Sequence, residues 1–242
     1  MHKLYDFIEA RERLTTVVVK TKLMHSPVFS EESGNEIYLK PENLQKTGSF
    51  KIRGAYNKIA KLTEEEKKKG VIASSAGNHA QGVAYAAKRL GIKAVIVMPK
   101  HTPLIKVEAT RKYGAEVVLH GEVYDDAYKK ALELQKENGY VFVHPFNDED
   151  VIEGQGTIAL EILDELPDAD IILVPLGGGG LVSGIASAAK LKNPQVKVIG
   201  VEPEGAASAI AALEKGKVVE LAEANTIADG TAVKRIGERN FE

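Results

Sequence analysis

Short strand-like runs alternate with helix-like segments along the chain from about Gly70 onward. The helical segments end in glycine or asparagine, residues that commonly follow the last turn of a helix. Strand, helix and strand joined by short links predict an α/β protein with parallel sheet and right-handed crossovers. The predicted strands are residues 71–74, 94–98, 116–119, 141–143, 171–175 and 198–201.

The N-terminal part of the chain has a different pattern. Residues 4–13 and 51–62 have helical periodicity, whereas residues 31–43 indicate a polar turn followed by a strand. The charged run at 62–70 predicts a solvated helix with its cap.

Charge and composition exclude several kinds of partner and chemistry. The chain has 242 residues and a formal net charge of -2, which offers no electrostatic attraction for nucleic acid or an anionic membrane. Because it has no cysteine, it can form no disulfide, thiolate metal site or thiol nucleophile. Its apolar runs are far shorter than the roughly 18 residues of a membrane span. We therefore expect a soluble, cytoplasmic protein with no nucleic-acid or membrane partner.

Four consecutive glycines follow one predicted strand and precede an alanine-rich helical pattern. In this tetraglycine loop, Gly177, Gly178, Gly179 and Gly180 allow successive backbone N–H groups to face one point. The N-terminus of the next helix adds partial positive charge, so the loop predicts a phosphate site. It matches neither the P-loop nor the dinucleotide-binding glycine motif. A turn that merely allows tight packing of helix on strand is the alternative.

A second turn, after the strand at 71–74, carries small and polar residues at another predicted helix start. Ser75, Gly77, Asn78 and His79 could present N–H donors to a small carboxylate. Capping of the helix by Ser74 or Ser75 is the alternative, as is a packing role for His79.

Lys51 stands at the predicted start of a helix, directly after Ser49 and Phe50. The positive end of the helix dipole disfavours its ammonium form, and burial would lower its pKa further. A neutral lysine amine is the usual Schiff-base anchor of pyridoxal phosphate, which also needs a phosphate site. An exposed lysine in the first helical turn is the commoner alternative.

Six motifs give the chain a resemblance to a known family. They are KPENLQKTGSFKIRGA at 40–55, SSAGNHAQGVA at 74–84, HPFND with EGQGT within 144–157, PLGGGGLVSG at 175–184, GVEPE at 200–204 and TIADGTAVK at 226–234. In this order they make the chain similar to the threonine and serine dehydratases, which are fold type II (tryptophan-synthase-β-like) pyridoxal-phosphate enzymes. The resemblance extends over essentially the whole chain.

The resemblance implies a role for each matching residue. Lys51 would form the Schiff base with pyridoxal 5'-phosphate, Phe50 would pack near it, and Asn78 would bind the phenolic oxygen of its ring. The phosphate would be bound by the backbone N–H groups of Gly177, Gly178, Gly179, Gly180 and Leu181. The substrate carboxylate would be bound by the turn formed by Ser75, Ala76, Gly77, Asn78 and His79.

The implied reaction is β-elimination of an amino acid. L-threonine would give 2-oxobutanoate and ammonia, and L-serine would give pyruvate. A serine racemase or another type II lyase is one alternative, and a catalytically silent protein that binds cofactor or amino acid is another. Synthases of the superfamily carry an acidic residue after the anchor lysine, where this chain has Ile52. Racemases use a serine as acid and base where this chain has Ala76, so dehydration is favoured.

The resemblance also implies the architecture. We expect two open, mainly parallel three-layer α/β/α domains with the cofactor in the cleft between them. Residues 1–47 and 148–242 would form the larger domain, lacking its C-terminal part, and residues 48–147 a smaller mobile domain that closes on substrate. A homodimer or homotetramer is expected. Glu202 matches one carboxylate of a metal site found in several relatives, but Ser208 replaces a second, so no metal is predicted.

Overall fold

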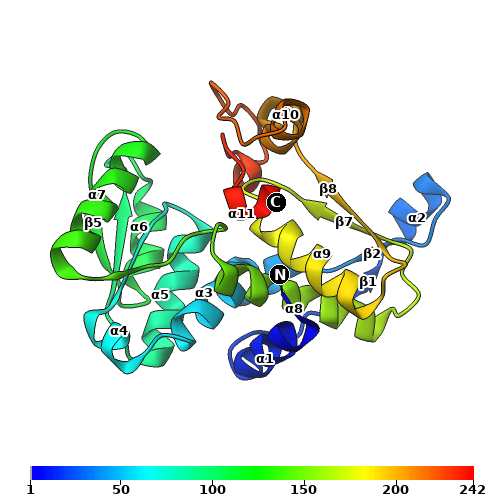
Figure 1. Ribbon diagram of the computed structural model, residues 1–242, viewed down its shortest axis with the longest axis horizontal. Coiled ribbons are helices and arrows are strands. Elements are labelled where there is room, and N and C mark those ends of the chain that lie inside the picture. The colour runs from blue at the N-terminus through cyan, green and yellow to red at the C-terminus, as the bar shows by residue number, and fades with distance from the viewer. Residues whose placement is uncertain (1) are drawn as a thin grey trace.

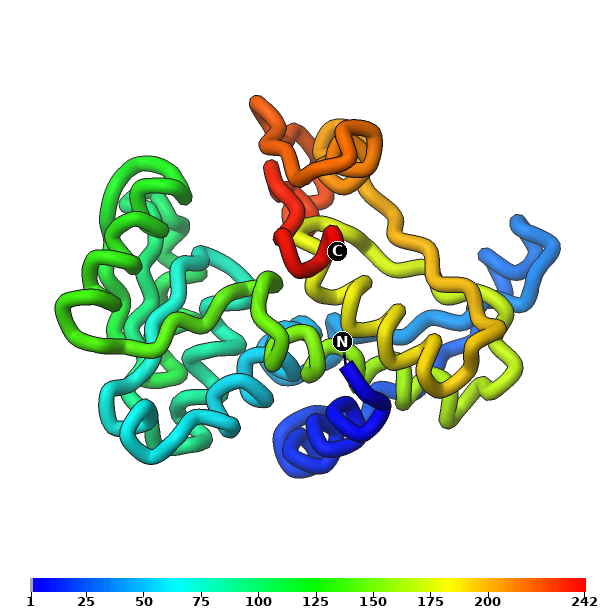
Figure 2. The backbone as a smooth tube through the Cα atoms, viewed as in Figure 1, coloured from blue at the N-terminus to red at the C-terminus, as the bar shows by residue number. Residues whose placement is uncertain are grey.

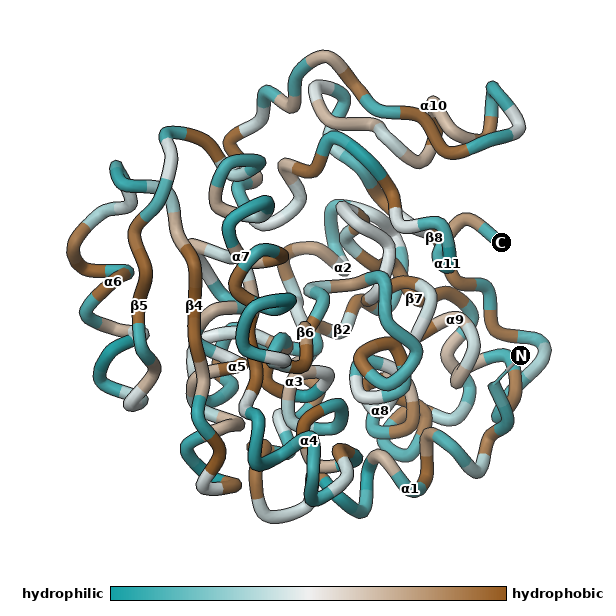
Figure 3. The backbone as a smooth tube through the Cα atoms, turned by 60° about the vertical axis from the view of Figure 1, so that its left-hand side comes forward, coloured by the Kyte–Doolittle hydropathy of each residue, from teal (hydrophilic) through white to brown (hydrophobic). Residues whose placement is uncertain are grey.

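Four parallel strands between residues 71 and 142 form the larger sheet in the computed structural model, which describes residues 2–242. The central strands β3 (Val71–Ser74) and β4 (Ala94–Met98) are flanked by β6 (Val141–Phe142) and β5 (Glu116–Leu119). In Figure 3, β4 is hydrophobic along its length, as expected for a strand covered on both faces. The predicted strands in this region are confirmed, with β6 one residue shorter than expected.

Helices cover both faces of this sheet. One face packs on α5 (Asn78–Leu90), α3 (Lys51–Ala60) and α6 (Leu104–Arg111), and the other on α7 (Tyr124–Asn138). The alternation of side chains along the strands decides the faces, because Ile72, Val95 and Val97 share a buried cluster with α7. Their sequence neighbours share the other cluster with α3 and α5.

A second parallel pair lies on the opposite side of the molecule, at the right of Figure 1. It consists of β7 (Ile171–Pro175) and β8 (Lys197–Val201), with α8 (Glu149–Glu165) and α9 (Gly180–Lys192) packed on one face. Ile172 and Val174 face these helices, whereas Ile171 and Leu173 on the other face are exposed. The predicted α/β class with parallel sheets is confirmed.

The remaining elements surround this framework. They are α1 (Leu4–Leu14), β1 (Met24–His25), α2 (Pro27–Ser33), β2 (Tyr38–Leu39), α4 (Glu64–Lys69), α10 (Ser208–Lys215), α11 (Glu238–Phe241) and four 3-10 turns (Glu42–Leu44, Lys46–Gly48, Glu204–Ala206 and Asp229–Thr231). As predicted for the charged run, Thr63 caps the short helix α4, and Gly70 follows its last turn.

Several helices differ from the sequence pattern. The structure contains α2, α10 and α11, which the sequence did not indicate, and α8 begins at Glu149, well before the expected periodic segment near Thr157. Glycines within α8 weaken the helical signal, but tertiary packing needs them. A Cβ at Gly154 would lie 2.6 Å from the carbonyl oxygen of Arg53, so α8 and α3 can approach only with glycine there.

The chain leaves the second group of elements once and returns once. Figure 2 shows it passing into the first group near α3 and leaving through the segment before α8. This path is the basis on which we propose residues 48–147 as the smaller domain and 1–47 with 148–242 as the larger. No helix in the described part of the chain is both long and apolar enough to cross a membrane.

Candidate active site

A cavity of about 310 Å³ lies where the start of α3 meets the loop between β7 and α9. Its lining includes the predicted cofactor residues Phe50, Lys51, Gly177, Gly178, Gly179, Gly180 and Leu181. The structure therefore brings together two motifs separated by more than a hundred residues of sequence. Asn78 and the rest of the 75–79 turn are not among the lining residues.

Lys51 is the first residue of α3 and its amine lies next to a backbone carbonyl. Its Nζ donates a hydrogen bond of 2.9 Å to the Pro145 carbonyl oxygen and lies 5.2 Å from the centroid of the Phe50 ring. Burial lowers the pKa of Lys51 from its ordinary 10.5 to about 8, because a buried ammonium loses its hydration. A larger fraction of the amine is thus in its neutral, nucleophilic form near neutral pH than for an ordinary lysine.

A buried ion network anchors the same helix two residues further on. The Arg53 side chain is fully buried, and it donates to both oxygens of Glu42 and both oxygens of Glu161. Lys40 also donates to Glu161, at 2.6 Å. Because Glu161 lies on α8, these bonds connect the start of α3 to α8 next to the cavity, which Lys40 and Glu42 line.

The tetraglycine loop is shaped by its neighbours. It leaves β7 after Pro175 and enters α9 at Gly180, with Gly179 at a φ of 94°, where side chains are strained. A Cβ at Gly178 would lie 2.3 Å from the Phe146 ring, and one at Gly179 would lie 2.6 Å from Cβ of Asn240. The loop therefore requires glycine for close packing as well as for backbone geometry, so the packing role that the sequence left open applies here.

The backbone donors of this loop fit a phosphate. Within residues 2–242, the N–H groups from Gly177 to Leu181 have no hydrogen-bond acceptor, and two of them, those of Gly180 and Leu181, belong to the first turn of α9. Free N–H groups at a helix N-terminus are the usual protein site for phosphate. The Lys51 amine opens onto the same cavity, so the residues present fit a phosphate-bearing aldehyde cofactor.

Sequence reasoning assigned no role to the turn at 144–147, which links β6 to α8. Pro145 accepts the hydrogen bond from Lys51, and Phe146 lines the cavity beside Gly178. The HPFND motif and its place directly after a strand were available as signals, because ligand sites form at the carboxyl ends of parallel strands.

The 75–79 turn follows β3 and lies beside the start of α3, where Gly82 approaches the Lys51 carbonyl. Ser75 does not cap α5, since its Oγ accepts from the N–H of Gly77. His79 is buried, and its Nε2 donates to the Val143 carbonyl at 2.8 Å. Burial, with the nearby Lys51 charge, lowers the pKa of His79 to about 3, so the ring is neutral. Substrate binding by this turn stays a prediction.

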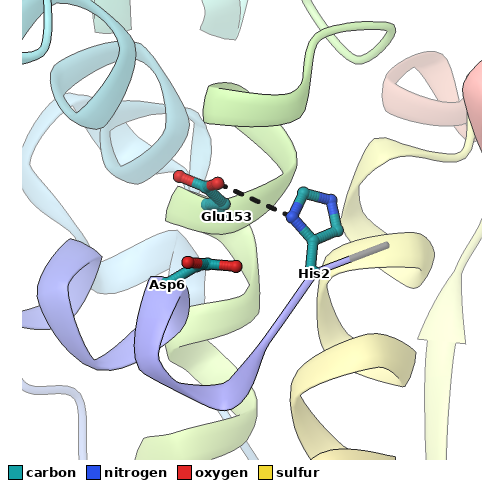
Figure 4. Close-up of side chains that lie close together, drawn as sticks. All are labelled: His2, Asp6 and Glu153. Carbon is teal, nitrogen blue, oxygen red and sulfur yellow. Dashed lines mark ion pairs between the residues drawn. The ribbon is translucent and has the colours of Figure 1, made fainter.

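Two places in the described chain carry side chains of the kind that bind metal ions. Both oxygens of Glu202 accept backbone N–H groups, from Ala209 and Ile210, at the start of α10. Elsewhere in the described chain, His2, Asp6 and Glu153 lie close enough to hold an ion (Figure 4).

These last three side chains already have protein partners. Glu153 accepts a hydrogen bond of 2.8 Å from Lys61 and pairs with His2 at 3.6 Å, while Asp6 accepts the backbone N–H of Lys3 at the start of α1. Ion pairing and helix capping therefore explain this cluster.

Comparison with known proteins agrees with the site. The sequence pattern of the family described as "Pyridoxal-phosphate dependent enzyme" matches residues 14–242. The chain belongs to this family. Its enzymes depend on pyridoxal phosphate, the cofactor that the lysine and the tetraglycine loop fit.

Among members of the family, the chain is 57% identical over 242 residues to the L-threonine ammonia-lyase of Thermotoga maritima, and it spans 60% of that protein's length. The structure of processed threonine deaminase isoform 2 from Solanum lycopersicum is similar, with a TM-score of 0.94 and 44% identity over 98% of this chain and 70% of that one. Maize serine racemase is similar with a TM-score of 0.95 and 39% identity, over 99% of this chain and 72% of that one.

Proposed function

We propose that this protein catalyses pyridoxal-phosphate-dependent β-elimination of L-threonine to 2-oxobutanoate and ammonia, and of L-serine to pyruvate. The observation that carries the proposal is the Lys51 amine, with its lowered pKa, on the same cavity as the unpaired N–H groups of the tetraglycine loop. The names of the Thermotoga and tomato relatives support threonine as substrate.

The two ends of the cavity bind different parts of the cofactor. The N–H groups of Gly177, Gly178, Gly179, Gly180 and Leu181 hold the phosphate, and Lys51 anchors the other end of the cofactor. When bound, the cofactor supplies an electron sink for the negative charge that develops at the substrate α-carbon. Once the substrate amine has displaced it from the cofactor, the Lys51 amine would take the α-proton as general base, and the Pro145 carbonyl would accept a hydrogen bond from the resulting ammonium.

The substrate carboxylate binds to the turn at 75–79, with Asn78 directed at the ring oxygen of the cofactor. The start of α5 supports this proposal, because its first N–H groups have no intrahelical acceptor. Closure of residues 48–147 over the substrate would exclude water from the carbanion.

Product formation tests the proposal. The purified chain is incubated with pyridoxal phosphate and L-threonine, and 2-oxobutanoate is measured. Replacing Lys51 by alanine removes the anchor and the base, so we expect a loss of about 10³-fold or more. Lys68→Ala, on the exposed side of α4, is the matched control and keeps full activity. A protein that binds the cofactor through Lys51 yet forms no 2-oxoacid would contradict the lyase assignment and favour a silent binding protein.

A serine racemase is the second candidate, because the maize enzyme has the same fold over nearly the whole chain. A racemase needs a second proton carrier on the face of the substrate opposite Lys51. At the position where racemases carry serine, this chain has Ala76, whose methyl group holds no proton. Incubation with L-serine distinguishes the two, since D-serine would indicate racemisation and pyruvate elimination.

We further propose a cytoplasmic homodimer or homotetramer. The net charge of -2 and the lack of a membrane-spanning helix among residues 2–242 support the location. Sedimentation of the cofactor-loaded protein measures the assembly state.

A further inference from the structure

The turn at 144–147, here called the HPFN turn, contacts two parts of the site. The Pro145 carbonyl accepts the hydrogen bond from Lys51, and the Phe146 ring occupies the space beside Gly178. The shape of this turn therefore affects the nucleophile and the tetraglycine loop together.

The ring of His144 closes the HPFN turn from inside. Its Nδ1 accepts the backbone N–H groups of Phe146, at 3.3 Å, and Asn147, at 2.8 Å. The same ring packs edge-on against Phe146, with centroids 4.7 Å apart and an interplanar angle of 86°. A ring nitrogen that accepts two N–H groups carries no proton. Burial lowers the pKa of His144 to about 4, so the ring keeps this acceptor near neutral pH.

The outer side of the turn is held separately. The Asn240 side chain donates to the carbonyls of Phe146 and Gly178, at 3.1 and 2.8 Å. Asn147 Oδ1 accepts the N–H of Arg239 at 3.0 Å. These bonds restrain Phe146 and Asn147 from α11, whereas the bonds inside the turn come from His144.

We propose that His144 is a positioning residue for Lys51. By accepting the two N–H groups, the imidazole sets the peptide planes after Pro145, and with them the direction of the carbonyl that meets the Lys51 amine. The ring of Pro145 has a fixed φ and lacks an N–H, so the prolyl residue itself supplies no other hydrogen bond to hold the turn. Its effect on turnover rests on the proposed function, because there Pro145 receives the ammonium formed when Lys51 takes the α-proton.

Two substitutions separate the acceptor from the ring. His144→Asn places an amide oxygen near the position of Nδ1 and removes the ring, whereas His144→Phe keeps an aromatic ring and removes the acceptor. If the acceptor positions Lys51, the asparagine variant retains the wild-type amide exchange, Lys51 labelling and kcat, and the phenylalanine variant does not. If ring packing alone matters, the phenylalanine variant retains these properties and the asparagine variant does not.

The first readout uses the protein without cofactor. Hydrogen exchange of the Phe146 and Asn147 amides is slow in wild type and His144→Asn, and about tenfold or more faster in His144→Phe, because the buried acceptor is lost. The pH midpoint for chemical labelling of Lys51 shifts in His144→Phe alone. Unchanged amide exchange and labelling in His144→Phe would overturn the proposal, as would equal loss in both variants.

The second readout uses the cofactor-loaded enzyme. We expect kcat for L-threonine to fall about 10- to 100-fold in His144→Phe with little change in KM, since a misplaced amine slows the proton step rather than binding. His144→Asn restores most of kcat. If His144→Phe does not fold, His144→Ala takes its place. Absence of 2-oxobutanoate from wild type would refute the proposed function, while the cofactor-free readouts would still decide the role of His144.

Discussion

Competitive labelling of lysines in the cofactor-free protein measures the pKa of Lys51 directly. Limited acetic anhydride is added at a series of pH values, and the modified fraction of each lysine is determined by mass spectrometry. Only the neutral amine reacts, so the labelling curve of Lys51 follows its deprotonation. Lys68, on the exposed side of α4, is the internal reference for a solvent-accessible amine.

The structure sets the expected size of the effect. Burial moves the pKa of Lys51 from 10.5 to about 8. At pH 7, the neutral fraction then rises from about 0.03% to about 9%, which is about 300-fold. Reaction with pyridoxal phosphate, followed by the visible absorbance of the Schiff base, should depend on pH in the same way. It should rise about tenfold per pH unit below pH 8 and level off above it.

Protein stability gives an independent measure of the same burial. Between pH 8 and 10.5 the unfolded chain binds a proton on Lys51 that the folded chain does not, so the contribution of this lysine to stability increases as pH rises. Replacing Lys51 by methionine should therefore raise the free energy of unfolding at pH 7, by at most about 3 kcal/mol. The advantage of the variant should shrink as pH approaches 10.5.

A labelling midpoint near 10.5 would refute the reasoning, because it would mean that the ammonium remains hydrated. A destabilised Lys51→Met variant at pH 7 would contradict it as well, since the hydrogen bond to Pro145 would then outweigh the cost of burying the charge.

Two further substitutions test the walls of the cavity. Gly178→Ala, whose Cβ would lie 2.3 Å from the Phe146 ring, should weaken cofactor binding about 10- to 100-fold in a fluorescence titration. Gly230→Ala is the control, because Gly230 lines the same cavity but its added Cβ meets nothing within 4 Å, and equal loss in both would argue against a steric cause. Glu161→Ala leaves the buried Arg53 with half its carboxylate partners and should lower the free energy of unfolding by about 3 to 5 kcal/mol in urea. An effect below 1 kcal/mol would show that the network is solvated.

The sequence was sufficient for the elements whose signal is local. Short β-branched, apolar runs marked the buried strands, and the charged run at 62–70 ended in the glycine that follows α4. The tetraglycine loop could also be read locally, because four successive glycines between strand and helix have few physical uses. Lys51 was different: spacing alone did not separate it from the other lysines and arginines, and its identification rested on the resemblance.

Only the tertiary structure decided how these parts meet. Contact with the Pro145 carbonyl and loss of hydration define the state of the Lys51 amine, and both depend on a turn 94 residues away. The start of α8 was hidden because Gly154 weakens the local helical signal, yet that glycine permits the close contact with α3. Helix propensity acts between neighbours in sequence, whereas burial and packing act between neighbours in space. The tetraglycine loop was therefore readable from sequence and Lys51 through the resemblance, but the contacts of both with the turn at 144–147 were visible only in the fold.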